Sequence, residues 1–558
     1  MFIKPLGNSN PYTRLLDEVS KGTSPISTYG IIEENIGHIS YALNRDLRKQ
    51  ILIITYDDIR AKRIYEDIKN FDKDVAMLFP TKDLLFYKVD AISTEINNRR
   101  LGVLFRLIQG DPLILVASIE SILNKLITPE LFKKHMLEIR VGDIIQLDDL
   151  AQLLIDSGYE RESMVEGVGQ FSIRGGIVDF FAPGNDNAYR IELFDDEVDS
   201  IRVFDTETQR SLDMLQSVHT VPVREVLILE DFRGDVIEGI NDSLEKATRN
   251  LDRDSALRQN LEEKFMDYIE GLSEGLHISN MDMLIPYIRD EYLSSILEYL
   301  QSDSMIVLDE PRRIEQRVGD IEEQFIFQYS QLLEQGEVLP QHEDITYGYP
   351  HIMNMYNNRI VMTNTALLGD SAGIKPKTII KFSSRPMQSF HNNLEFLKEE
   401  LDHYIYRGYR IIIFSGTEQR GRKLMEALED LGIRSTYVAD PHRDIGTGQI
   451  FITAGSIGAG FEYMDIKFAF IGEREIYRSV RGRARKPKAR TKGDMVTTAE
   501  LNPGDYVVHE NHGIGLYEGT EQLDIQGIKK DYLTINYQGN DKLYVPVDQL
   551  DLLQRYIG

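Results

Sequence analysis

The sequence of 558 residues contains no cysteine. Disulfides, zinc ribbons and thiol catalysis are therefore excluded, and the composition fits a reducing compartment. No stretch approaches the roughly 18 consecutive apolar residues of a membrane-spanning helix. The start, MFIKPLGNSNPY, also lacks the basic-then-apolar order of a signal peptide. These absences predict a soluble cytoplasmic protein with no membrane partner.

Basic residues are few relative to acidic ones. The chain has 63 Lys+Arg against 90 Asp+Glu, which gives a formal net charge of −27. A surface of this sign repels phosphate, whereas a grip on duplex DNA depends on neutralising phosphates. Protein partners are therefore favoured over a broad DNA-binding face. The length exceeds what one hydrophobic core supports and suggests about three to five domains.

The sequence also lacks a phosphate-binding loop of the form G-x-x-x-x-G-K-[ST]. The corresponding stretch, STYGIIEENIGH, carries these residues at the critical positions: Gly30, Glu33, Glu34, Asn35 and Ile36. The first glycine is kept, but asparagine replaces the second glycine and isoleucine replaces the lysine. The two glutamates would lie beside the β-phosphate, and like charges about 4 Å apart cost about 4 kcal/mol at an effective dielectric of about 20. The loop is predicted not to hold ATP.

A second acidic pair, Asp309-Glu310, follows the apolar run at 304–308. In a motor ATPase, a pair at this position would hold Mg²⁺ and orient water. Without a phosphate cradle opposite, a structural role is the better interpretation. The 11 histidines are scattered singly, so no catalytic residue, metal site or bound cofactor is predicted.

Apolar runs alternate with helical patterns in two parts of the chain, residues 1–128 and 351–475. Examples are the runs at 50–55 and 112–117 in the first part and at 409–414 in the second. That alternation predicts parallel sheets covered by helices. The fold class is therefore α/β with several domains.

Other patterns interrupt and follow this alternation. Residues 129–222 contain short strands and turns, as in GQFSIRGGIVDFFAPG, which predicts an inserted α+β module. Residues 223–350 have long charged helical patterns at 241–272 and return to a buried strand, so they complete the first α/β domain. From 501 to 558, short alternating runs separated by glycine turns predict a small, strongly bent antiparallel barrel.

A basic stretch, residues 476–500, precedes the barrel. Its cations run from Arg478 to Lys492 with no acidic residue among them. A solvated linker between domains is one interpretation, and an electrostatic contact with nucleic acid or an acidic partner is the other.

Two arginines of the inserted module, Arg161 and Arg174, flank a strand turn rich in aromatic residues. Exposed arginine beside aromatic side chains is typical of a protein-binding hot spot. The alternative is that both arginines pair with neighbouring acids: Glu162, Glu166 or Asp179. Phe171 and Phe180 are predicted to belong to the core.

In the barrel, Leu523 and Ile525 fall on one side of the run at 520–525. If that run is an edge strand, it can add to a partner's sheet through main-chain hydrogen bonds, with Leu523 filling a pocket. The alternative is that both side chains face the barrel core.

The strings DYVVHENHGIGLYEG, KDYLTINY and NDKLYVPVDQLDLLQRY resemble the RNA-polymerase-interacting domain of the bacterial transcription-repair coupling factors (Mfd). That domain is similar to the CarD-type transcription regulators. Residues 1–350 resemble the family's UvrB-like module, whose ATP site is degenerate, and residues 376–473 resemble its next α/β domain. The resemblance covers essentially the whole chain. It implies degenerate RecA-like domains and an SH3/Tudor-like barrel.

The same resemblance implies partners. The barrel would bind the β subunit of stalled RNA polymerase, with Leu523 and Ile525 nearest the contact. The inserted module would recruit UvrA for nucleotide excision repair through Arg161, Arg174 and Phe181. Little room exists between residues 83–87 and 95–100 for the aromatic hairpin with which UvrB separates damaged strands, so damage probing is not expected.

Full-length members of the family are ATP-dependent DNA translocases, in which motor domains that use ATP and Mg²⁺ and hold most of the DNA contacts follow the barrel. The chain is therefore interpreted as the non-motor part. Two alternatives remain. One is an active UvrB-like helicase subunit, which Ile36 at the lysine position opposes. The other is a CarD-like transcription regulator, which leaves about 500 residues unexplained.

Overall fold

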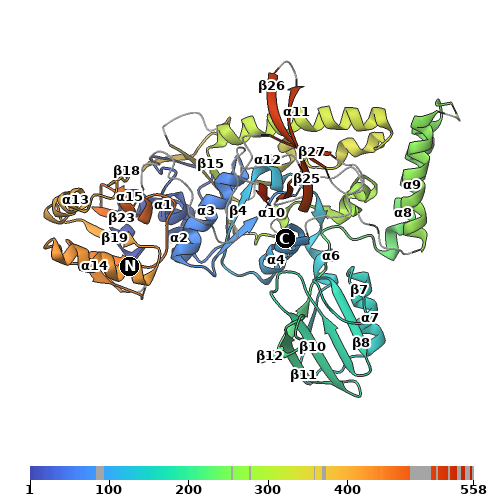
Figure 1. The fold of residues 1–558 in the computed structure, drawn as a ribbon, viewed down its shortest axis with the longest axis horizontal. Helices are drawn as coiled ribbons and strands as arrows, with labels where there is room; N and C mark the ends of the chain where they lie inside the picture. Colours follow the sequence, from blue (N-terminus) through green and yellow to red (C-terminus); the bar gives the residue numbers. More distant parts are fainter. Residues whose placement is uncertain are drawn as a thin grey trace. The chain divides into compact units, whose positions relative to one another are not determined.

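A computed structural model describes most of the chain (Figure 1). The described residues are 1–82, 94–252, 255–274, 278, 280–356, 359–366, 372–440, 443–477, 504–509, 513–525, 528–536, 542–546 and 553–555. They form two compact units, one of residues 1–87 and 96–480 and the other of residues 88–95 and 481–558. None of the helices in these ranges is long and apolar enough to cross a membrane.

The first unit is built on a parallel sheet of seven strands in the order β17-β1-β16-β15-β2-β4-β3. Its strands are β1 (Ile26–Tyr29), β2 (Ile51–Thr55), β3 (Ala76–Phe79), β4 (Ile114–Ser118), β15 (Met305–Asp309), β16 (Ile360–Thr365) and β17 (Thr378–Lys381). Every residue of β2, β4 and β15 is buried, because helices cover both faces of a parallel sheet. The strands predicted at 50–55, 112–117 and 304–309 are present.

Helices of several lengths accompany this sheet. The longer ones are α1 (Asn10–Ser20), α2 (Ile36–Leu47), α3 (Asp58–Phe71), α4 (Thr94–Gln109), α8 (Glu230–Thr248), α9 (Ala256–Glu274), α11 (Pro311–Gln335) and α12 (Tyr349–Tyr356). The shorter elements are α5 (Ile119–Ile122), α6 (Pro129–Lys134), α10 (Ile296–Tyr299) and the pair β5 (Leu126–Ile127) and β14 (Leu293–Ser294). The charged pattern at 241–272 thus belongs to two helices, α8 and α9.

The boundary predicted at residue 350 differs from the sheet topology. β16 and β17 lie beyond that residue, yet they flank β1 in the first sheet. The physical reason is burial: five of the six residues of β16 are buried, which a strand achieves only inside a sheet that is covered on both faces. The first sheet therefore continues to Lys381.

The inserted module carries an antiparallel sheet with the order β12-β11-β10-β9-β8-β7, apart from a short parallel pair between β7 and β8. Its elements are α7 (Leu147–Asp156), β7 (Glu160–Arg161), β8 (Gln170–Arg174), β9 (Ile177–Phe180), β10 (Ala188–Phe194), β11 (Glu197–Phe204) and β12 (Ser211–Leu215). β6 (Leu137–Arg140) and β13 (Ser217–Thr220) pair at its base. Leu150 and Leu154 of α7 pack on Phe171 and Phe180 in one cluster, so these two phenylalanines belong to the core as predicted.

A second, mixed sheet has the order β18-β22-β23-β19-β21-β20. Its elements are β18 (Ser384–Pro386), α13 (Leu394–Tyr406), β19 (Arg410–Phe414), α14 (Glu418–Asp430), β20 (Thr436–Tyr437), β21 (Ile450–Thr453), β22 (Phe461–Tyr463), β23 (Phe468–Ile471) and α15 (Glu473–Tyr477). The predicted run at 409–414 matches β19 within one residue. Four neighbouring strands of this sheet are parallel, and the strands β18 and β22 are antiparallel to their partners.

The two large sheets share a buried core in which His38 is central. His38 Nδ1 lies 2.7 Å from the Tyr463 hydroxyl, and Nε2 lies 2.8 Å from the Phe2 carbonyl oxygen. The rings of Phe71 and Phe470 flank the imidazole. Burial among them lowers the pKa of His38 to about 4, because desolvation penalises the charged ring.

The second unit contains a five-stranded antiparallel sheet with the order β27-β26-β25-β24-β28. Its strands are β24 (Tyr506–His509), β25 (Gly513–Ile525), β26 (Ile528–Asn536), β27 (Lys542–Pro546) and β28 (Leu553–Arg555). The pairings among the described residues leave β27 and β28 at the two margins. Closure into an SH3/Tudor-like barrel therefore stays a prediction.

Candidate functional site

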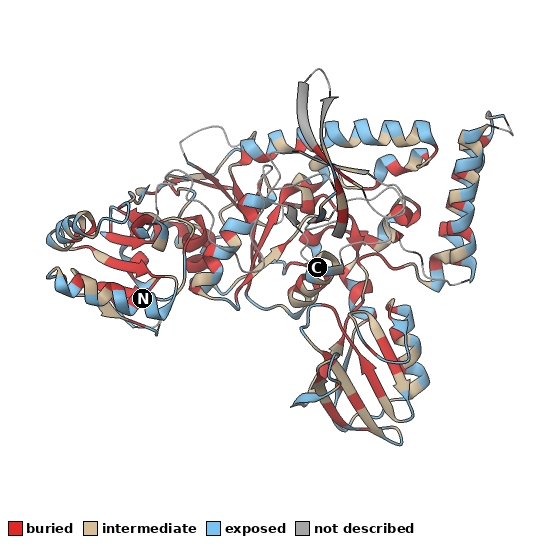
Figure 2. Cartoon of the chain, viewed as in Figure 1, coloured by how far each residue is buried: buried red, intermediate tan, exposed pale blue. Residues whose placement is uncertain are grey.

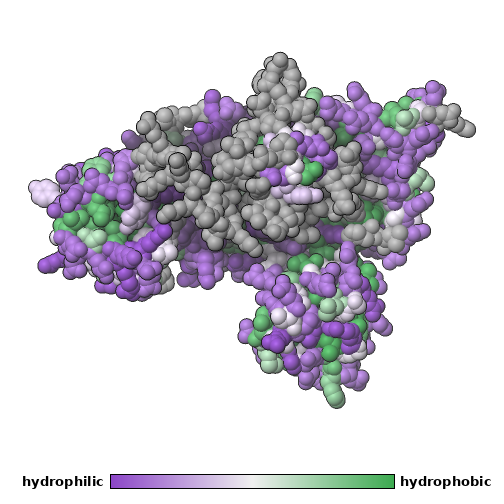
Figure 3. Space-filling model, in the orientation of Figure 1, coloured by the Kyte–Doolittle hydropathy of each residue, from purple (hydrophilic) through white to green (hydrophobic). Residues whose placement is uncertain are grey.

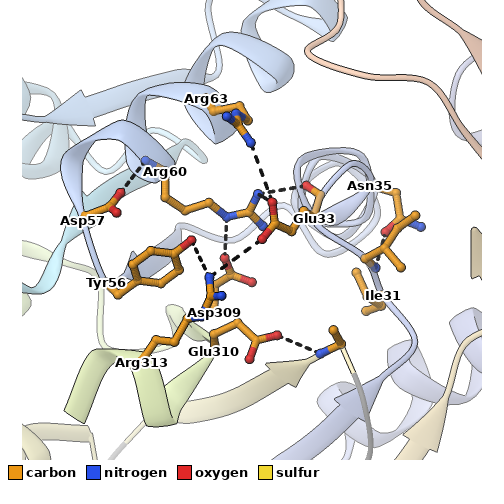
Figure 4. A network of polar contacts seen from close by, with 12 residues as sticks. Ile31, Glu33, Asn35, Tyr56, Asp57, Arg60, Arg63, Asp309, Glu310 and Arg313 are labelled. Atoms are coloured by element: carbon orange, nitrogen blue, oxygen red, sulfur yellow. Dashed lines mark hydrogen bonds and ion pairs between the residues drawn. The ribbon is translucent and has the colours of Figure 1, made fainter. Parts of the chain in front are cut away.

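The region that corresponds to a phosphate loop lies at the carboxyl ends of β1, β15, β16 and β2. This edge is where open α/β sheets usually bind ligands. Figure 4 shows that protein side chains converge on the same place from several elements. The central residue is Arg60, which the sequence analysis did not single out.

Arg60 forms a buried ion pair with Asp309. The arginine projects from α3 with only 3% of its side chain exposed, and Asp309 is 1% exposed. Arg60 Nε donates to Asp309 Oδ2 at 2.9 Å, and Arg60 Nη1 donates to the Glu33 carbonyl oxygen at 3.2 Å. Asn364 Nδ2 donates to the other carboxylate oxygen of Asp309 at 3.2 Å. The Arg60 guanidinium thus neutralises the buried Asp309 carboxylate.

Glu33 is surrounded by cations. Its carboxylate lies 3.6 Å from Arg60 Nη1, 3.6 Å from Arg63 Nη1 and 3.9 Å from Arg313 Nη1. Arg313 also donates to the Tyr56 hydroxyl at 2.8 Å. The sequence predicts that Glu33 opposes phosphate by repulsion, whereas the structure shows its charge paired.

The other residues of the loop also have structural partners. Asn35 Oδ1 accepts a hydrogen bond from the Ile32 amide at 2.9 Å, and Ile36 is buried at the start of α2. Gly30 has φ of +80°, and a Cβ atom there would lie 2.3 Å from the Phe382 carbonyl oxygen. The glycine is therefore required by this close backbone approach. Glu34 is half-buried.

Glu310 adopts a left-handed conformation before α11, and its Oε1 accepts a hydrogen bond from the Ala366 amide at 2.8 Å. Both carboxylates of the Asp309-Glu310 pair therefore bind protein donors.

On the inserted module, a row of charged side chains crosses the sheet face turned away from α7. We call this the charged face and define it by Arg174, Asp179, Arg190 and Arg202. Asp179 is buried and bridges two arginines: Arg174 Nη2 donates to it at 2.6 Å, and Arg190 donates from Nε and Nη2 at 2.7 and 2.8 Å. The pairing that the sequence offered as an alternative is thus present for Arg174, although 47% of its side chain stays exposed.

Arg190 is a second residue that the sequence analysis missed. The β9–β10 register places it directly opposite Asp179, and its guanidinium lies 4.6 Å from the centroid of the Phe204 ring. Only that register identifies it, because the alternation in YRIELF marks a strand without showing its partner strand.

Arg161 and Arg174 do not share a face. Arg161 pairs with Phe171 in the β7–β8 register, and Phe171 points into the core under α7. Because successive residues of a strand alternate between faces, Arg174 points to the opposite side from Phe171. Arg161 is exposed at the β7 margin of the sheet.

Phe181 is buried, whereas the resemblance implies a contact with UvrA. Its ring packs with Val165, Ala188 and Phe204 in a small cluster. Strand alternation after Phe180 turns Phe181 toward the charged face, where these apolar neighbours cover it. The Phe181 ring is therefore part of the apolar packing of the module and not an exposed contact residue.

Leu523 and Ile525 lie in the outer part of β25. Leu523 pairs with Lys530 and Ile525 with Ile528 across the hairpin to β26. β24 pairs with β25 only from Gly513 to Leu516, so the described pairings leave the backbone at 520–525 with one neighbouring strand (Figure 1). The basic residues from Arg478 to Lys492 and the stretch at 83–93 lie outside the described residues.

Two regions of the chain match known protein families. Residues 137–225 match the family model of the UvrB interaction domain, and residues 501–557 match that of the CarD-like/TRCF RID domain. The chain is 32% identical over 559 residues to the transcription-repair-coupling factor of Bacillus subtilis (strain 168), and the match covers 100% of this chain. Along its whole length, the chain is homologous to transcription-repair-coupling factors.

A second relative, the transcription-repair-coupling factor of Staphylococcus aureus (strain MRSA252), is 31% identical over 524 residues, which is 91% of this chain. The matches cover 47% and 43% of the two relatives, so the chain spans about half of their length. The UvrB interaction match begins at β6 and ends shortly after β13, and it therefore coincides with the inserted module.

Proposed function

We propose that the chain is the partner-binding part of a transcription-repair-coupling factor. In this proposal the inserted module binds UvrA and the terminal sheet binds the β subunit of RNA polymerase. The observation that carries it is the whole-length homology together with the two domain matches on separate folded regions. The domain division predicted from the sequence, with the boundary at residue 350 moved to Lys381, is part of the proposal.

The UvrA contact is proposed to centre on Arg174. Its guanidinium is held by Asp179, which fixes its orientation, and almost half of the side chain remains available. A preorganised arginine loses less side-chain entropy on binding and presents several donors to a partner carboxylate. Arg161, at the β7 margin, would contribute a second cation at the edge of the same sheet.

Charge reversal tests this contact. Arg174→Glu should weaken UvrA binding by roughly 2 kcal/mol, the size expected of a hot-spot arginine, and the double variant with Arg161→Glu should bind less still. The matched control is Arg422→Glu on α14, since Arg422 is 57% exposed and is also paired with a nearby carboxylate, Glu418. UvrA binding by the double variant at the parent's affinity would place the site elsewhere.

The polymerase contact is proposed to use the outer part of β25. Its backbone between residues 520 and 525 is paired on one side in the described structure, so a partner strand can add on the other side. In this proposal Leu523 supplies an apolar anchor, worth about 2 kcal/mol if fully buried.

Leu523→Arg should therefore abolish pull-down of the polymerase β subunit by the full chain. Tyr506→Arg is the matched control, because Tyr506 is an exposed apolar residue on β24. Circular dichroism should show the sheet intact in both variants. Unfolding of Leu523→Arg would instead assign Leu523 to the core of an SH3/Tudor-like barrel and move the partner surface to another strand.

The phosphate-loop region is proposed to bind no nucleotide. Its support is the set of internal partners described above: Arg60 neutralises Asp309, and three arginines surround Glu33. Displacing Arg60 would leave the buried Asp309 carboxylate without a countercharge, which is strongly unfavourable. Any ATP-driven step would then require residues other than these.

A further inference from the structure

The inserted module exposes apolar side chains on its outer strand, β12. Leu212 is 53% exposed and Met214 is 72% exposed. Figure 2 draws β12 mostly in the colour of exposed residues, whereas the neighbouring strands of the sheet mix buried and intermediate colours. Exposed apolar residues at a sheet edge promote aggregation of a free protein, and they usually mark a surface that a partner covers.

The backbone of β12 is also available. Among the described residues β12 pairs with β11 alone, with Ile201 opposite Leu215 and Arg202 opposite Met214. No other backbone hydrogen bond among the described residues reaches Ser211–Leu215 from outside this pair. The opposite margin, β7, is only two residues long. β12 is therefore the edge of this sheet that can accept a further strand.

Met214 of β12 continues the charged face, whereas Leu212 lies at an irregularity in the β11–β12 register and has no residue directly opposite it. Directly paired residues point to the same side of a sheet, so Met214 shares the side of Arg202. Arg202 in turn is opposite Arg190, the partner of Asp179. A partner seated on the charged face would reach the β12 edge without a gap. Figure 3 shows green apolar side chains interspersed with purple polar ones on this module.

The charge on β12 favours a partner strand that carries a basic residue. Asp213 lies between the two apolar residues and is exposed. A second copy of this chain, paired antiparallel about Asp213, would bring two carboxylates directly opposite each other, which destabilises a strand pair. A strand with a lysine or arginine at that position, and apolar residues beside it, has the complementary pattern.

We propose that β12 accepts an extended segment of UvrA that carries a basic residue opposite Asp213 and apolar residues against Leu212 and Met214. This inference rests on the proposed UvrA binding by the module and extends the contact from the charged face to the sheet edge. Main-chain hydrogen bonds to β12 supply affinity, and the alternation of apolar and basic residues supplies register and specificity.

The test uses the full chain and purified UvrA. The double variant Leu212→Lys/Met214→Lys and the single variant Asp213→Lys should each lower the affinity at least tenfold. Ile155→Lys is the matched control, because Ile155 is an exposed apolar residue of the same module on α7. All variants should have the melting temperature of the parent, since each replaced side chain is exposed.

Amide hydrogen exchange of the unaltered chain gives a second readout. Addition of a strand should slow exchange at alternate amides of 211–215 in the UvrA complex, because those amides gain acceptors. Unchanged affinity of the edge variants, or unchanged exchange at 211–215 in a formed complex, would overturn the inference. In either case, loss of binding on reversing Arg174 would leave the proposed function intact. Absence of any UvrA binding by the parent would overturn both.

Discussion

Arg60 offers a sharp test of how the phosphate-loop region is stabilised. Replacing it by methionine keeps an unbranched side chain of similar length but removes the guanidinium. Asp309 would then be a buried carboxylate, 1% exposed, with Asn364 as its remaining donor among the contacts described above. The carboxylate cannot move to solvent, because it ends a strand in the middle of the sheet.

The expected cost follows from that burial. Breaking a buried ion pair by removing one partner typically costs about 3–5 kcal/mol, so Arg60→Met should lower the free energy of unfolding by about that amount. Replacing both partners, Arg60→Met with Asp309→Asn, leaves a neutral amide in place of the charge and should cost less than Arg60→Met alone. Arg63→Met is the control: Arg63 is 53% exposed and 3.6 Å from Glu33, so its loss should cost no more than about 0.5 kcal/mol.

Urea denaturation followed by circular dichroism measures these differences. A cost for Arg60→Met no larger than that for Arg63→Met would refute the reasoning. So would a double variant as unstable as the sum of the two single changes.

Three further outcomes are expected. Calorimetry should detect no micromolar ATP binding by the chain, and DNA should stimulate no ATP turnover. Either signal would contradict the proposal that the phosphate-loop region binds no nucleotide. His38 has a folded pKa of about 4 against an unfolded value of about 6.5, so the unfolded chain binds the extra proton between these values. Stability should fall on acidification through that window, by about 2 kcal/mol between pH 7.5 and pH 5 for this one group, and His38→Phe should show a correspondingly shallower pH dependence in urea denaturation. Gly30→Ala should destabilise the chain by more than Gly408→Ala in thermal melts. Both glycines have positive φ, but of the two only Gly30 faces a backbone oxygen, that of Phe382, at 2.3 Å from the added Cβ. Equal costs would show that the loop can move aside.

Local pattern was sufficient for much of the architecture. Continuous apolar runs predicted β2, β4 and β15, and the run at 409–414 predicted β19 within one residue. These elements are recognisable because a strand buried on both faces requires a continuous apolar run. A helix buried on one side likewise requires apolar residues at helical spacing. The homology that the terminal strings indicate is likewise a property of the sequence, and the comparisons support it along the whole chain.

Tertiary structure decided the partners of individual side chains. Arg60 and Asp309 are separated by 249 positions, and nothing in either local pattern indicates their contact. Strand register places Arg190 opposite Asp179 and turns Arg161 away from Arg174. A one-residue slip in register would turn each side chain to the other face of the sheet. The extension of the first sheet to Lys381 and the burial of Phe181 depend in the same way on which elements pack together. The sequence by itself determined the elements and the family, whereas long-range pairing determined which charges are neutralised inside and which remain available to a partner.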